Sequence, residues 1–188
     1  MFWLLLATGF TGGMTFLFCT RWLYNWLFPP PALDVHFSPK GGCADRVVRE
    51  IGNARHEVLV LAYSFTSKAI TEALIAAHRR GVIVDVVLDH SNEKDEHTDL
   101  GLLEAAGLKP LVDPHHAIAH NKVMVIDRRT VLTGSFNFTR QAEHENAENL
   151  LVLHHHREMV AAYRQNFHVH RDHARQPEKQ AVVHRRAA

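Results

Sequence analysis

Hydrophobic and polar residues alternate in blocks beyond about Leu33, and each block predicts one element. Apolar runs predict strands at Glu57–Tyr63, Val82–Leu88, Lys122–Ile126, Thr130–Thr133 and Asn149–Leu153, and helical periodicity predicts helices at Lys68–Arg80, Thr98–Ala106 and Arg157–Phe167. Helices that alternate with strands predict an α/β fold, a sandwich with a mixed, mostly parallel sheet flanked by helices. The segment Lys122–Ile126 does not alternate in polarity, which predicts a strand buried on both faces.

The first block of the chain differs from the rest. Phe2 to Thr20 carries no charged side chain, and four aromatic residues and three prolines follow, namely Trp22, Tyr24, Trp26, Phe28 and Pro29 to Pro31. About 20 apolar residues suffice to span a bilayer, and aromatic rings are enriched at its surface. We therefore expect a transmembrane anchor over residues 1–28 and a proline linker over 29–33. A cleaved signal peptide remains the alternative, and a buried helix is the weakest option.

From this block we expect the protein either to be anchored in a membrane by a single pass or to be exported to the periplasm. The single charge of Arg21 leaves the side of the membrane open. The remaining chain is expected to form a catalytic domain over 34–170 and a polar, disordered tail over 171–188.

Composition excludes little. The 188 residues allow one domain with a sizeable core, and the net charge of +1 creates no strong field that would recruit nucleic acid or anionic lipid. The two cysteines stand outside any C-x-x-C spacing, so no cysteine metal site is expected. The charged segment 89–99 and most of the 16 histidines are interpreted as solvated.

The strongest chemical signal is a set of spaced polar residues: His120, Lys122, Asp127, Gly134, Ser135 and Asn137. His120 and Lys122 are two residues apart at the start of a strand, so their side chains share one face. An imidazole there attacks phosphorus, while the ammonium holds an anionic oxygen. Ser135 and Asn137, also two apart, offer a hydroxyl and an amide to the same phosphate oxygens. Asp127 lies in the turn between two strands and is interpreted as structural.

This spacing resembles the H-x-K-x4-D-x6-G-S-x-N signature of the phospholipase D superfamily. The segments YSFTSKAITEAL, RRGVIVDVVLD, TGSFNFT and AENLLVL resemble its small single-motif bacterial endonucleases and its mitochondrial cardiolipin hydrolases. The resemblance covers roughly Val35 to Phe167 and implies a phospholipase D-like sandwich. It also implies that Glu148 holds the second ring nitrogen of His120, and that Gly134 is a structural member of the motif.

The implied chemistry requires two histidines, one that forms a phosphohistidine and one that protonates the leaving oxygen. The H-x-K pair occurs once in the chain. We therefore expect a homodimer that brings two copies of His120 to one phosphate. No metal and no cofactor is expected in this site, so activity should survive EDTA.

Three functions fit these residues. The first is a metal-independent, non-specific endonuclease acting on DNA or RNA, and the second is a phospholipase D acting on phosphatidylcholine or cardiolipin at a membrane. The third, a catalytically silent module that binds nucleic acid or lipid, is disfavoured because His120, Lys122, Asn137 and Glu148 are all present. Phe65, Phe136 and Phe138 either stack on bases or pack in the core, and His115 and His116 either line the site or are solvated.

Overall fold

The computed structural model describes residues 2–178, and it describes the side chains from Met14 onward. The chain divides into two compact units, 1–32 and the part from Leu33 onward. The first unit contains helix α1, Phe2–Leu27. The side chains of residues 2–13, on which much of the predicted anchor depends, lie outside the described part. Among the described residues, no helix combines the length and the apolar character needed to cross a membrane.

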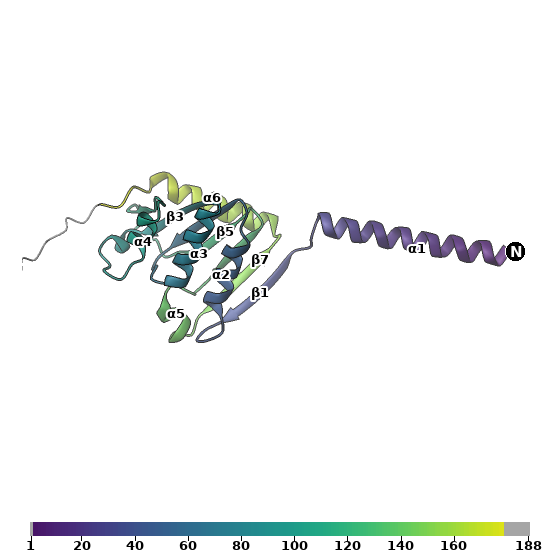
Figure 1. The fold of residues 1–188 in the computed structure, drawn as a ribbon, viewed down its shortest axis with the longest axis horizontal. Helices are drawn as coiled ribbons and strands as arrows, with labels where there is room; N and C mark the ends of the chain where they lie inside the picture. Colours follow the sequence, from purple (N-terminus) through teal and green to yellow (C-terminus); the bar gives the residue numbers. More distant parts are fainter. Residues whose placement is uncertain (1, 179–188) are drawn as a thin grey trace, which may run out of the picture. The chain divides into compact units, whose positions relative to one another are not determined.

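The second unit is built on one seven-stranded sheet with the strand order β1-β7-β6-β5-β2-β3-β4 (Figure 1). The strands are β1 Ala32–Phe37, β2 Glu57–Ala62, β3 Ile83–Asp89, β4 Leu111–Asp113, β5 Lys122–Ile126, β6 Thr130–Gly134 and β7 Asn149–His154. All five predicted strands are therefore present, with ends that differ by one residue at most. The exposed strand β1 and the three-residue strand β4 were not predicted.

The direction of the strands corrects one prediction. The sheet is mixed, but it is not mostly parallel: β2–β3 and β3–β4 pair in parallel, whereas β2–β5, β5–β6 and β6–β7 pair antiparallel. The turn between β5 and β6 holds only three residues, which is too short for a parallel crossover and forces a hairpin.

Helices cover both faces of the sheet, which explains why the central strands β2 and β5 are mostly apolar. The helices are α2 Cys43–Asn53, α3 Lys68–Arg79, α4 Leu100–Ala105, α5 Arg140–His144 and α6 Arg157–His173, together with the 3₁₀ helix η1 His90–Glu93. Along β2, Val58 and Val60 join the core under α2, α3 and α4, while Leu59 and Leu61 join the core under α6. All five residues of β5 are buried, as predicted for a strand with two covered faces.

The C-terminal segment is more ordered than its polarity suggested. Helix α6 continues to His173, beyond the expected start of the tail at residue 171. Arg175 then pairs with Val112 by backbone hydrogen bonds and forms a two-pronged ion pair with Glu93. The expected disorder of residues 179–188 lies outside the described residues.

Candidate active site

The predicted site residues except Asp127 come from strand ends that meet at one edge of the sheet, because of the antiparallel register. Lys122 at the start of β5 pairs with Ala62 at the end of β2, and Gly134 at the end of β6 pairs with Leu150 near the start of β7. The residues just beyond these strand ends are Tyr63, His120, Ser135, Asn137 and Glu148. Segments far apart in the sequence thus deliver their polar side chains to one place.

His120 lies exposed in the loop before β5, where an attacking group must be accessible. Its ring contacts the ring of Tyr63 edge-on, with 4.7 Å between the ring centroids. The backbone fixes this pair, because the amide of Tyr63 donates to the carbonyl oxygen of Asn121 over 2.8 Å. Tyr63 was not identified as a site residue from the sequence, although it is the last residue of a predicted buried strand.

Lys122 is the buried cation of the site. Its Nζ lies 5.2 Å from the centroid of the Tyr63 ring and has no hydrogen-bond partner among the described residues. Burial lowers the pKa of Lys122, and the negative charge of Glu148 only partly opposes this. A buried ammonium without a partner is costly, and an anionic ligand would supply the missing acceptor. Lys122 is therefore prepared to bind a phosphate oxygen.

Ser135 and Asn137 differ in the hydrogen bonds that their side chains already make. The Oγ of Ser135 accepts hydrogen bonds from the backbone N–H and the side-chain amide of Asn149, at 3.0 and 3.3 Å. The hydroxyl proton of Ser135 remains available for donation. The Oδ1 of Asn137 is buried and, within residues 14–178, has no hydrogen-bond partner. This oxygen can only accept a hydrogen bond, so it is the N–H of the Asn137 amide that could donate to a phosphate oxygen.

Glu148 does not contact His120 within its own chain. Its Oε1 accepts a hydrogen bond from the side-chain amide of Asn146 over 3.0 Å. Its backbone is held by Ser38, whose N–H donates to the Glu148 carbonyl oxygen and whose Oγ accepts from the Glu148 N–H. The carboxylate is close enough to act on the pKa of Lys122. Its expected role as the partner of His120 therefore remains a proposal.

Asp127 lies at the opposite end of β5 from His120, about 15 Å or more along the strand. Its carboxylate accepts backbone hydrogen bonds from Arg55, His56 and Glu57 at 2.9, 2.7 and 3.0 Å. Partial burial acts to raise the pKa of Asp127, but these hydrogen bonds outweigh it and hold the pKa below the ordinary value of 3.8. The carboxylate therefore ties the β5–β6 turn to the start of β2.

Replacing Asp127 with asparagine is expected to lower the free energy of unfolding by about 1 kcal/mol at neutral pH while leaving turnover unchanged. Because the folded pKa is lowered, the stabilisation is present above pH 3.8 and is lost as the pH falls below it. Denaturant unfolding at pH 7 and pH 3 measures the effect, with the exposed Asp172→Asn as the control. A large loss of turnover at unchanged stability would instead place Asp127 in the chemistry.

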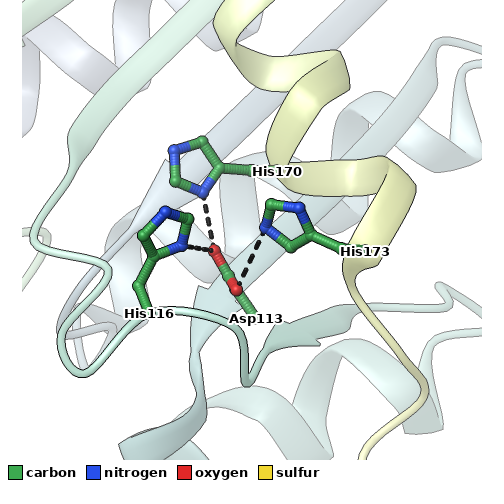
Figure 2. A group of neighbouring side chains, drawn as sticks. All are labelled: Asp113, His116, His170 and His173. Atoms are coloured by element: carbon green, nitrogen blue, oxygen red, sulfur yellow. Dashed lines mark hydrogen bonds and ion pairs between the residues drawn. The ribbon is translucent and has the colours of Figure 1, made fainter.

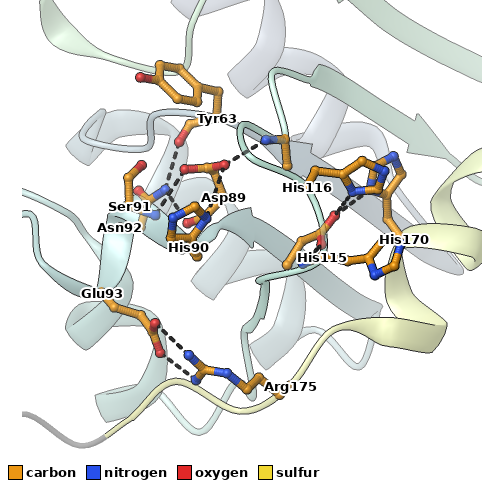
Figure 3. A network of polar contacts seen from close by, with 12 residues as sticks. Tyr63, Asp89, His90, Ser91, Asn92, Glu93, His115, His116, His170 and Arg175 are labelled. Carbon is orange, nitrogen blue, oxygen red and sulfur yellow. Dashed lines mark hydrogen bonds and ion pairs between the residues drawn. The ribbon is translucent and has the colours of Figure 1, made fainter.

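Part of the charged segment 89–99 supports the loop that precedes β5, as Figure 3 shows. Asp89 and Asn92 are buried, contrary to the expected solvated loop. The Oδ2 of Asp89 accepts the backbone N–H of Ala119 over 2.7 Å, one residue before His120. The side-chain amide of Asn92 donates to the carbonyl oxygen of Tyr63 over 2.7 Å. Asp89 and Asn92 thus hold the backbone next to His120 and at Tyr63. Nothing in the local sequence distinguished these two residues from solvated polar residues.

The remaining candidates do not add side chains to this site. Phe65, Phe136 and Phe138 are at most 1% exposed, so they pack in the core and cannot stack on bases. His116 joins Asp113, His170 and His173 in a cluster that could hold a metal ion. This cluster was not predicted from the sequence.

Comparisons with known proteins agree with this geometry. A family model described as "Cardiolipin synthase, PLD-like domain" matches residues 47–171. A phospholipase D of Rickettsia felis is 41% identical over 131 residues, which is 70% of this chain and 65% of the relative. A mitochondrial cardiolipin hydrolase of Xenopus laevis is 32% identical over 124 residues, covering 66% of this chain and 56% of the relative. The chain thus spans about 65% of the length of the Rickettsia felis protein.

A solved structure is similar over its whole length. The phospholipase D family member Nuc from Salmonella typhimurium superposes with a TM-score of 0.75 at 32% identity, covering 78% of this chain and 98% of that one. NucT from Helicobacter pylori, at 21% identity and a TM-score of 0.72, supports the fold alone.

Proposed function

This chain belongs to the phospholipase D superfamily, and from that premise we propose that it hydrolyses phosphodiester bonds with His120 as the nucleophile. The observation that carries the proposal is the buried Nζ of Lys122, which has no hydrogen-bond partner in the described part of the chain and lies beside the ring that contacts His120. A cation of this kind next to an exposed imidazole suits an anionic phosphorus centre.

In the first step, a ring nitrogen of His120 attacks phosphorus, and the bond from phosphorus to one ester oxygen breaks. The phosphoryl group, which still carries its second ester oxygen, becomes bonded to the imidazole. Lys122, Ser135 and Asn137 hold the non-bridging oxygens, where negative charge increases in the transition state. The leaving oxygen takes a proton from a second histidine.

In the second step, that second histidine removes a proton from water, and the resulting hydroxide displaces the imidazole of His120 from phosphorus. The second histidine is the His120 of a partner subunit, because the sequence contains one H-x-K pair. We place the exposed apolar side chain of Ile118, 59% accessible and two residues from His120, at this subunit contact. Glu148 is proposed to stabilise the imidazolium once the dimer and substrate are assembled.

The dimer is testable by its mass. Light scattering of the active protein should give about twice the chain mass of 21.4 kDa. Replacing Ile118 with aspartate should shift the mass toward that of a monomer and lower activity in proportion, while the exposed Leu102→Asp serves as the control. An active sample with the mass of one chain would contradict the shared site.

Nucleic acid is the first candidate substrate. The resemblance to the short single-motif endonucleases of the superfamily supports it, because that resemblance extends over nearly the whole folded domain. No base-reading side chain is proposed, so cleavage should be non-specific and should fall with rising salt.

Phospholipid is the second candidate, favoured by the names of the relatives in Rickettsia and Xenopus, which are phospholipase D and cardiolipin hydrolase. The N-terminal helix would support it if it attaches the protein to a membrane, as we propose. In its described part this helix leaves Trp22, Tyr24 and Trp26 more than 60% exposed. Flotation with vesicles, lost when the chain starts at Leu33, tests this attachment.

One assay separates the two substrates. The purified protein is incubated in EDTA with single-stranded DNA, RNA, duplex DNA, phosphatidylcholine vesicles and cardiolipin vesicles, beside His120→Ala. We expect the wild type to cleave at least one class and His120→Ala to cleave none. Equal turnover by both proteins would remove the assignment, and cleavage of lipid alone would replace the nuclease with a phospholipase.

A further inference from the structure

A second group of functional side chains lies between the loop that leads to His120 and the last turn of α6 (Figure 2). It consists of Asp113 at the end of β4, His116 in the loop that follows, and His170 and His173 on α6. Each residue offers one ligand atom, and these four atoms all lie within 4.8 Å of one another. None of the four takes part in the proposed reaction.

The three imidazoles converge on one carboxylate. The Oδ2 of Asp113 lies 2.6 Å from the Nδ1 of His170 and 3.0 Å from the Nδ1 of His116. Its Oδ1 lies 3.2 Å from the Nε2 of His173. That last nitrogen is buried, and its contact lacks hydrogen-bond geometry, so it has no hydrogen-bond partner among the described residues. Hydrogen bonding within the cluster therefore leaves one nitrogen unsatisfied.

We propose that Asp113, His116, His170 and His173 bind one divalent transition metal ion, with zinc as the best fit. Imidazole nitrogens and a carboxylate oxygen are typical zinc ligands, and four of them complete a tetrahedral site. Ligand atoms about 2.0–2.1 Å from a tetrahedral zinc lie roughly 3.3 Å from one another. The oxygens of Asp113 lie 2.6 to 3.2 Å from the imidazole nitrogens, whereas separations among the four ligand atoms extend up to 4.8 Å, so the imidazoles must move closer together around the ion.

The surroundings hold the ligands in orientation, as the outer shell of a metal site does. The backbone N–H of His115 donates to the Oδ1 of Asp113 over 2.9 Å. The other ring nitrogen of His170 lies 3.5 Å from the side-chain amide of Asn121, and Asn121 lines the same crevice as Asp113 and His170. When the Nδ1 of His170 binds the ion, this other nitrogen carries the proton, so the Asn121 amide must turn its oxygen toward it to accept that hydrogen bond. The carboxylate of Asp113 is fully buried, whereas 43% of the His116 side chain is exposed, which leaves an entry path for the ion.

The spacing in the sequence fits this reading. Asp113 and His116 form a D-x-x-H pair, and His170 and His173 form an H-x-x-H pair three residues apart on one helix face. Because all four positions of the metal are filled by the protein, the site is structural and has no open position for a substrate. The ion would clamp the segment 113–121 against α6 and thereby steady the loop that carries His120.

The test uses the full chain, purified without a metal-affinity step, stripped of metal and then titrated with zinc or cobalt. We expect about one equivalent of zinc per chain, a visible tetrahedral Co²⁺ spectrum, and a thermal midpoint raised by roughly 5–10 °C when zinc is in excess. His116→Ala and His173→Ala should each lower zinc affinity at least about 10-fold and abolish the cobalt spectrum. His168→Ala, exposed on the same helix, should behave as the wild type.

The outcome is independent of the proposed function, because metal content and the cobalt spectrum are measured without a substrate. His120→Ala should bind zinc like the wild type. A wild-type chain that takes up no zinc or cobalt would overturn the proposal and leave a hydrogen-bonded network of imidazoles around Asp113. Binding that is unchanged in both His116→Ala and His173→Ala would place the ion elsewhere and overturn it as well.

Discussion

Lys122→Met is expected to lower turnover by about 10²–10³-fold while raising the thermal midpoint of unfolding. The ammonium is the fixed positive charge of the site, so its loss removes stabilisation of the phosphorus transition state. The same ammonium is buried without a hydrogen-bond partner in the described part of the protein, so an isosteric apolar side chain removes a desolvation penalty. Activity and stability should therefore change in opposite directions.

Turnover and thermal unfolding of Lys122→Met, with the exposed Lys68→Met as the control, measure both effects. The pH dependence provides a further check. Burial lowers the pKa of Lys122 in the folded protein below its ordinary value of 10.5. Between the folded and the unfolded pKa, the unfolded chain binds more protons than the folded one, so the free energy of unfolding of the wild type rises with pH. Lys122→Met should lose this contribution. A variant that is less stable and still active would show that Lys122 only packs.

Gly134→Ala is expected to be the most destabilising small substitution in the site, with a cost of about 3–5 kcal/mol. Gly134 has a φ of 144°, and a Cβ there would lie 2.3 Å from the backbone oxygen of Asn149. Backbone atoms of a paired strand cannot move away cheaply. The displaced Asn149 would also lose its hydrogen bonds to Ser135, so the phosphate site should fail together with the fold.

Chemical denaturation of Gly134→Ala measures this cost. Gly101→Ala is the matched control, because Gly101 lies in helix α4 with no atom near the position of an added Cβ. Alanine also favours a helix over glycine, so Gly101→Ala should be neutral or slightly stabilising. Equal stability of the two variants would show that the close approach at Gly134 does not constrain the sheet.

The elements that the sequence predicted well are those whose pattern reflects burial. Strands β2, β3 and β5 are continuous apolar runs because helices cover both faces of the sheet, and the predicted ends are close to the observed ones. Strands β1 and β4 were missed because the first is mostly exposed and the second has only three residues. The prediction of a mostly parallel sheet was wrong because the three-residue turn after β5 forces a hairpin, and the strands from β2 through β5 and β6 to β7 pair antiparallel.

The site residues that belong to one sequence motif could be predicted, whereas those that depend on tertiary contacts could not. His120, Lys122, Ser135 and Asn137 come from a spaced motif, and the register brings their strand ends together. Tyr63, Asp89 and Asn92 gain their roles from contacts between segments about 30 to 60 residues apart, which no local pattern encodes. The cluster around Asp113 joins two short spaced pairs that are 54 residues apart in the chain, between His116 and His170.

The central claim is that the imidazole of His120 becomes covalently phosphorylated during turnover. The most direct measurement is to quench the reaction at alkaline pH, where phosphohistidine survives, and to locate the adduct by peptide mass spectrometry. We predict a phosphoryl group, still esterified to one half of the substrate, on the peptide that contains His120 and absent from His120→Ala. An adduct on another side chain, or continued turnover with no adduct on any residue, would contradict the account.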